Sequence, residues 1–158
     1  MDFTTKRDAL TYLYSLQLMV LLSYPVAAYA APHFSENDLI VLADQIKKPR
    51  IALTSLFQMI SKHLSLEPLQ VIWHETSQIT EWGFYLAFYP HGADAIEQLN
   101  AITRRAYHCL RSGKNAEFAE NLADSYRMIL ASVQAYMVDQ YNFTEALSVQ
   151  VPDRDSLK

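Results

Sequence analysis

Apolar residues recur every three to four positions along almost the whole chain, which is the period of an α-helix. Breaks in this pattern separate predicted helices over residues 5–24, 36–48, 50–64, 68–89, 93–112 and 116–142. A short helix or loop is expected over 25–34, and Thr76 and Ser77 could interrupt the fourth helix. The pattern therefore predicts an all-α protein.

Helix-end signals support several of these boundaries. Ser35-x-x-Asp38 has the spacing of a capping box, and Pro49 suits the first turn of the helix that follows it. Gly113 is the residue expected just after a helix end, and Asn115 is the predicted cap of the last helix. The turn between these two helices is short, so we expect an antiparallel hairpin at the C-terminal side.

The segments predict one domain, because the chain has no internal repeat, linker or low-complexity stretch. We expect a single compact bundle of about five to six helices over residues 1–143. The pattern weakens after residue 143, so residues 144–158 are predicted to form a loosely ordered C-terminal tail.

Residues 9–31 contain no charged side chain, and three structures fit such a run. A helix inside the bundle is favoured by the capping box Thr5-x-x-Asp8 and by apolar residues on more than one face. A cleaved signal peptide over residues 1–30 is the alternative, with Ala28-Tyr29-Ala30 as the cleavage site. A membrane span is less supported, because Pro25 shortens the apolar stretch. We expect a cytoplasmic protein, or a periplasmic or secreted one if the site is cleaved.

The amino-acid composition limits the classes of function that this protein can have. Among 158 residues, 51% are hydrophobic and only three are glycine, which indicates a well-packed core rather than disorder. The formal net charge of −4 disfavours a nucleic-acid partner, because phosphate binding needs a basic surface. The single cysteine, Cys109, lies on an apolar helical face and is expected to be buried and inert.

No motif predicts an enzyme or a cofactor. The chain has neither a Gly-rich phosphate loop nor a nucleophile elbow. His74-Glu75-x-x-Gln78 resembles the zinc-protease pattern but lacks its second histidine. His74 with the carboxylates Glu67 and Glu81 leaves a metal-binding bundle as one alternative.

Aromatic residues concentrate between positions 73 and 89, beyond what one helix face buries. Trp82, Tyr85 and Tyr89 follow one another at i, i+3 and i+7, so they share a face. Tyrosine and tryptophan are common anchors of protein interfaces. These three residues are therefore the predicted partner-binding surface, while Phe84 and Phe88 are expected in the core.

A basic cluster closes the fifth predicted helix: Arg104, Arg105, His108 and Arg111. It is a candidate site for an anion or a partner. The alternative is structural, because basic residues stabilise a helix C-terminus and acidic residues open the next helix.

The segment Trp82-Gly83-x-x-x-Ala87-Phe88-x-x-x-Gly92 resembles the start of the central helix in Bcl-2-like proteins. The resemblance covers eleven residues and implies a helical regulator that binds another protein.

Together these observations predict a non-enzymatic protein–protein interaction module. An adaptor, a chaperone-like protein or a homo-oligomeric subunit fits, and its partner is another protein or a second copy in a homodimer. The alternatives are the exported helical protein, the Bcl-2-like regulator and the metal-binding bundle.

Overall fold

The computed structural model describes residues 6–48, 52–87 and 93–153. Within these ranges it is all helical, which confirms the predicted fold class. The elements are α1 (Lys6–Ala30), η1 (Ala31–His33), α2 (Glu36–Ile46), α3 (Leu53–Lys62), α4 (Glu67–Ala87), α5 (Ala93–Arg111), α6 (Asn115–Tyr141) and η3 (Thr144–Ser148).

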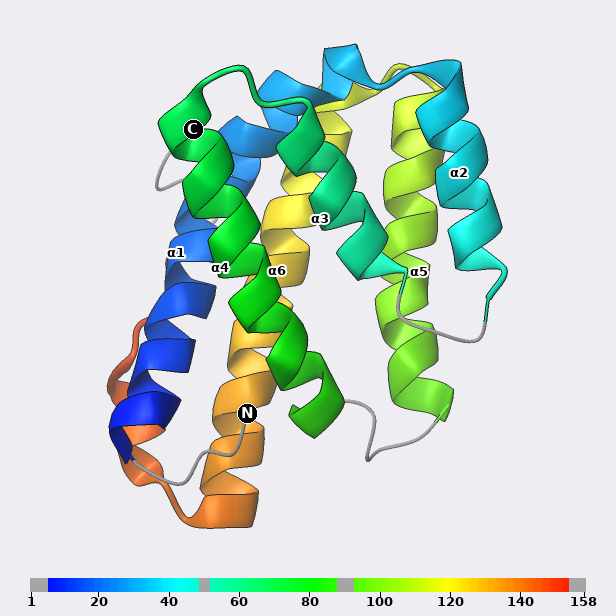
Figure 1. Ribbon diagram of the computed structural model, residues 1–158. Coiled ribbons are helices and arrows are strands. Elements are labelled where there is room, and N and C mark those ends of the chain that lie inside the picture. Colours follow the sequence, from blue (N-terminus) through cyan, green and yellow to red (C-terminus); the bar gives the residue numbers. More distant parts are fainter. Residues whose placement is uncertain (1–5, 49–51, 88–92, 154–158) are drawn as a thin grey trace.

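The bundle is built around α6, which contacts α1, α4 and α5. In Figure 1, α1 and α4 lie side by side at one edge, α6 runs behind them, and α2 and α5 form the opposite edge. Helices α5 and α6 form the expected hairpin. Gly113 adopts φ of 70° in its turn, and the Lys114 N–H closes the end of α5 on the Cys109 carbonyl at 2.9 Å.

An aromatic cluster joins the helices at the centre of the core. The rings of Phe57 and Tyr126 stack with centroids 4.8 Å apart, and Trp73 meets both edge-on. The Trp73 indole donates to the Phe57 carbonyl at 3.1 Å, and the Tyr12 hydroxyl donates to the Thr80 carbonyl at 3.0 Å. The rings therefore join α3, α4 and α6, and the Tyr12 hydrogen bond attaches α1 to α4.

The first helix is longer than predicted. It continues through Pro25 to Ala30, whereas a helix over 5–24 followed by a loop or short helix was expected. Pro25 removes only one intrahelical hydrogen bond and lies exposed, while Val26, Ala27 and Ala30 continue the buried stripe. Core packing thus outweighs the local effect of the proline. The predicted cap Thr5 lies outside the described residues.

Three other helix ends or interruptions differ from expectation. Helix α4 runs unbroken through Thr76 and Ser77, which are both buried, and the hydroxyls of Ser77 and Thr80 donate to carbonyls of their own helix. Asn115 lies inside α6, whose N-cap position is Lys114 without a side-chain cap. Helix α3 begins at Leu53, and Pro49 lies outside the described residues. The capping box at the start of α2 is present as predicted.

The C-terminal segment is packed as far as it is described, whereas loose order was expected from Thr144 onward. Phe143, Ala146 and Val149 are buried around η3. The buried Gln134 amide donates to the carbonyls of Ala146 and Val149 at 2.9 and 2.6 Å. A buried polar side chain on α6 therefore holds this segment in place.

By length and composition, the segment from Asp8 to His33 could cross a membrane. Within its apolar window, 44% of the residues are buried inside the bundle. Leu13, Leu16 and Met19 are fully buried, so α1 supplies a central part of the core.

Replacing Leu16 with alanine tests this role. Leu16 is fully buried, so we expect a loss of about 2–5 kcal/mol in the free energy of unfolding. Leu18 on the same helix is 37% exposed, and Leu18→Ala should cost less than about 1 kcal/mol. Urea unfolding at low protein concentration measures both. Equal losses for the two variants would contradict the burial of α1.

A chain that starts at Ala31 tests whether the bundle can form without α1. We expect an insoluble or molten product, because removal of α1 exposes the apolar faces of α4 and α6. Near-ultraviolet circular dichroism and thermal unfolding report the result. A cooperatively unfolding 31–158 chain would contradict this expectation and support the signal-peptide alternative.

Candidate interaction surface

The outward side of α1 carries an apolar stripe. It consists of Tyr14, Leu18, Leu22, Pro25 and Tyr29, and we call it the α1 stripe. Tyr14 is 54% exposed, Leu18 37% and Tyr29 42%, while Leu22 is half-buried. No charged residue occurs between Asp8 and His33. The stripe is therefore an uncharged strip of surface along the helix.

The exposed side of α1 is apolar because this helix is apolar on nearly all sides. The bundle covers the side of α1 that faces α4 and α6, which leaves the opposite side to solvent. A surface helix of a globular protein usually places charged residues on that opposite side. A contiguous apolar surface of this kind is typical of an interaction site.

Helix α4 borders the stripe on one side. The Tyr29 hydroxyl hydrogen-bonds the Ser65 hydroxyl just before α4, and Tyr12 reaches Thr80 near its other end. These bonds set an antiparallel register that brings Leu22 level with Ile72, which is 43% exposed. The apolar surface thus widens onto α4.

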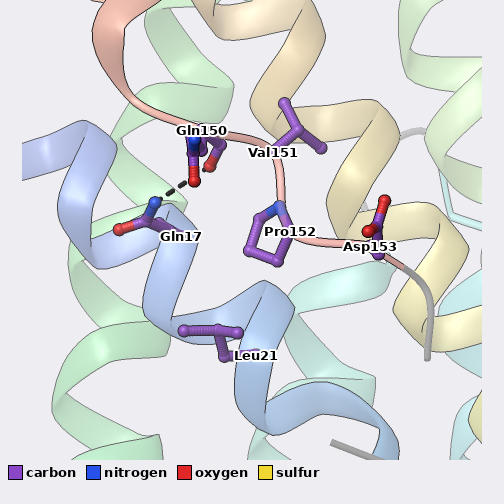
Figure 2. Close-up of a pocket in the computed structure, with 6 residues that line it drawn as sticks. All are labelled: Gln17, Leu21, Gln150, Val151, Pro152 and Asp153. Atoms are coloured by element: carbon purple, nitrogen blue, oxygen red, sulfur yellow. Dashed lines mark hydrogen bonds between the residues drawn. The ribbon is translucent and has the colours of Figure 1, made fainter. Parts of the chain in front are cut away.

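The C-terminal segment borders the stripe on its other side. Figure 2 shows Gln17 and Leu21 of α1 facing Gln150 and Pro152, with the Gln17 amide donating to the Gln150 carbonyl at 2.9 Å. Arg127 of α6 donates to the Pro152 carbonyl at 2.8 Å. A pocket of about 570 Å³ is lined by Gln17 and Leu21 of α1 and by residues 150–153. The segment therefore forms one wall beside the stripe rather than covering it.

The sequence-predicted partner surface is not described at the side-chain level. Trp82 and Tyr85 belong to α4, but their side chains lie outside the described part, and Tyr89 lies outside it entirely. The Bcl-2-like segment ends in the same undescribed residues. The three aromatic residues remain a prediction from the sequence.

The structure keeps the predicted basic cluster at the end of α5 and pairs two of its members with carboxylates. Arg104 pairs with Glu97 on its own helix, and Arg111 pairs with Glu36 on α2. Arg105 and His108 are exposed, and the His108 ring contacts that of Tyr107. Two of the four cations thus have carboxylate partners at the surface, and the anion or partner site stays a prediction from the sequence.

Cys109 and His74 offer little chemistry in this fold. Cys109 is buried as expected, and burial raises the pKa of its thiol, which favours the unreactive form. His74 is exposed on α4 and its ring accepts from the Gln78 amide at 3.1 Å. Among the described residues, no three His, Cys, Asp or Glu side chains are grouped to hold a metal ion.

A buried carboxylate that the sequence assigned only a capping role joins two helices. Asp38 in the first turn of α2 accepts from Lys62 Nζ at 3.1 Å and from His63 Nε2 at 2.7 Å, at the end of α3. Burial alone would raise the pKa of Asp38. Hydrogen bonds from the Ser35 backbone N–H, Lys62 and His63 instead hold it well below its usual range. The ionised carboxylate therefore stabilises the α2–α3 contact.

Asp38→Asn tests this contact through its pH dependence. At neutral pH we expect a loss of about 1–3 kcal/mol in the free energy of unfolding. Because the folded-state pKa is lowered, the contribution is complete above the unfolded pKa of about 4 and disappears as the pH falls further. The difference between wild type and variant, measured by urea unfolding, should therefore shrink below about pH 4.

Asp44→Asn is the matched control. Asp44 lies on the same helix but forms an exposed pair with Lys48 at 3.2 Å, so the change should be within about 0.5 kcal/mol. A constant effect of Asp38→Asn across the acid range would contradict the lowered pKa.

Comparison with known proteins gives no relative for this chain: no family model, no curated protein and no solved structure matches it. Support for the candidate surface therefore comes from its geometry and its amino-acid composition. The α1 stripe carries no charge, and the two tyrosine hydroxyls are the only strong hydrogen-bonding groups among its side chains.

Proposed function

We propose that this protein is a non-enzymatic interaction module that binds a protein partner through the α1 stripe. The observation that carries the proposal is the uncharged apolar surface on a helix whose other side forms the core. Exposed apolar surface is costly in water, and covering it with a partner removes that cost.

The composition of the stripe supports a protein partner. Tyr14 and Tyr29 are large, rigid side chains with a polar end, which suits a surface that is wet when free and buried when bound. Leu18 and Leu22 lie between them along the helix and supply the apolar centre. An apolar centre with tyrosine at both ends is a typical interface arrangement.

The rigid setting of the stripe also supports binding. Tyr12, Leu16 and Met19 on the inner side of α1 are fully buried, so the backbone beneath the stripe is held by the core. The entropic cost of ordering this helix when a partner binds would then be small. The adaptor, chaperone-like and oligomeric roles all use such a surface, and the identity of the partner separates them.

Site-specific photo-crosslinking in cells tests the proposal. A photoreactive amino acid at Tyr14 should yield adducts with protein, because this position faces outward in the stripe. The same probe at Gln140, an exposed position on α6, is the matched control and should yield few. A third probe at Tyr85 tests the partner-binding surface that the sequence predicts. Adducts are identified by mass after proteolysis.

The three positions give separate outcomes. Protein adducts at Tyr14 but not at Gln140 support binding through the α1 stripe. Adducts at Tyr85 alone would move the binding surface to the C-terminal part of α4 and overturn the assignment to α1. Equal yields at Tyr14 and Gln140 would show non-specific encounter and contradict the proposal.

A further inference from the structure

We propose that residues 144–153, which we call the strap, open from α1 and α6 while the bundle stays folded, and that opening enlarges the surface of the α1 stripe. The second part of this inference rests on the proposed function, whereas the first part does not. Three features carry it: how the strap is held, where it joins α6, and which part of α1 lies beside it.

The strap buries little apolar surface. Of its ten residues only Ala146 and Val149 are buried, and both side chains are small. Six of the other eight residues are exposed. The N–H groups of Ala146 and Val149 meet carbonyls of the 3₁₀ helix η3 at 3.2 and 3.4 Å, which is long for a backbone hydrogen bond. The strap therefore has much less to lose on opening than a core helix has.

Side chains of α1 and α6 hold the strap by its main chain. Four hydrogen bonds run from these side chains to strap carbonyls: from Gln134 to Ala146 (2.9 Å) and Val149 (2.6 Å), from Gln17 to Gln150 (2.9 Å), and from Arg127 to Pro152 (2.8 Å). Gln134 supplies two of the four. Donors and carbonyls both regain water when the strap opens, so these bonds fix the closed position at a small net free energy.

Helix α6 ends on its own hydrogen bonds. Asn142 adopts φ of 52°, and its N–H donates to the Val138 carbonyl at 3.0 Å. The Phe143 N–H donates to the Met137 carbonyl at 3.2 Å, and the Phe143 side chain is buried. The end of α6 thus needs no contact with the strap. Rotation of the backbone just after Phe143 would open the strap and leave the last turn of α6 in place.

The closed strap covers a flank of α1 next to the stripe. In Figure 1 the chain turns back after α6 and runs along α1, and η3 contacts both helices. Figure 2 shows Leu21 of α1 beside Pro152 of the strap. Leu21 is three residues from Leu18, so the two are neighbours on the surface of the helix. Opening would therefore uncover Leu21 and join it to the α1 stripe.

Thiol labelling of the full chain, in a Cys109→Ala background, measures opening. Val149→Cys puts a thiol on the buried side of the strap, where a water-soluble disulfide reagent reaches it only after opening. Val26→Cys is the matched control, because Val26 is 1% exposed and lies on α1. Relative to each thiol in urea-unfolded chain, the strap thiol should react at least about 100-fold faster than the control. Equal rates would show that the strap opens only when the bundle unfolds and would overturn the proposal.

Gln134→Leu tests how the strap is held. Leucine donates no hydrogen bond, so two strap carbonyls lose their donor in the closed state and bind water in the open state. Labelling of Val149→Cys should accelerate at least about tenfold, while labelling of Val26→Cys stays unchanged. Gln140→Leu, at an exposed position on α6, is the matched control and should change neither rate. Equal acceleration of both thiols would show that Gln134 only stabilises the bundle, and would contradict local opening.

Hydrogen exchange of the wild-type chain checks opening without a cysteine in the strap. The N–H groups of Ala146 and Val149 are hydrogen-bonded within η3, so their exchange reports the open state. They should exchange at least about 100-fold faster than N–H groups in the middle of α1 and α6. Exchange at the same rate as the middle of α6 would overturn the proposal.

A photoreactive amino acid of leucine size at Leu21 tests the link to binding. In the otherwise wild-type chain it should give adducts mainly with residues 150–153 of the same chain, because the closed strap lies beside it. Gln134→Leu should lower these adducts and raise those with other proteins, whereas Gln140→Leu should change neither. A fall in the internal adducts without a rise in protein adducts would overturn the enlargement of the stripe.

The outcomes separate this inference from the proposed function. Thiol labelling and hydrogen exchange need no partner, so they decide local opening whether or not another protein binds. Equal adduct yields at Tyr14 and Gln140 would contradict the proposed function and leave local opening standing. Protein adducts at Tyr14, together with equal labelling of the Val149→Cys and Val26→Cys thiols, would overturn the strap and leave the interaction module standing.

Discussion

The packing of α1 along α6 is the contact on which the rest of the fold depends. The two helices contribute many of the fully buried large side chains, including Tyr126 of the aromatic cluster on α6 and Tyr12 on α1, whose hydroxyl donates to the Thr80 carbonyl. Helix α4 completes the cluster through Trp73, and α3 through Phe57. Loss of α1 would therefore expose the faces of both α4 and α6, which is why the apolar N-terminal segment is structural in this bundle.

That packing also creates the surface we assign to binding. A helix with apolar residues on all sides is most stable when every side is buried, but α4, α6 and the C-terminal segment pack against only part of α1. The uncovered part is the α1 stripe. Its rigidity and its lack of charge have the same origin, because both follow from a core helix placed at the edge of the bundle. Stability and interaction are thus linked through one element.

The periphery uses polar contacts where apolar burial is small. Helix α2 buries only Leu39, Leu42 and Asp38 among its residues, so its attachment relies on the buried carboxylate as well as on packing. The same principle holds at the C-terminal side, where the buried Gln134 amide secures η3. In both places a buried polar group with satisfied hydrogen bonds directs a short segment to one position. The Tyr126 hydroxyl is the exception, since it is buried and has no hydrogen-bond partner among the described residues.

Local chemistry in the sequence was enough to predict the helical class, the capping box at Ser35 and the turn at Gly113. Each of these depends on residues within one or two turns of one another, so the information is contained in the neighbouring sequence. The sequence also showed that residues 9–31 are uncharged. It could not show which side of that helix faces solvent, because a helix that is apolar all round has no distinguishable face.

The tertiary structure decided the remaining features, and each involves residues far apart in the chain. Continuation of α1 through Pro25 depends on the packing of the residues that follow it, and the Asp38–His63 contact joins two helices. The α1 stripe is defined by which neighbours α1 has, rather than by its own residues alone. Those neighbours come from α4 and α6, and only the folded chain brings them together.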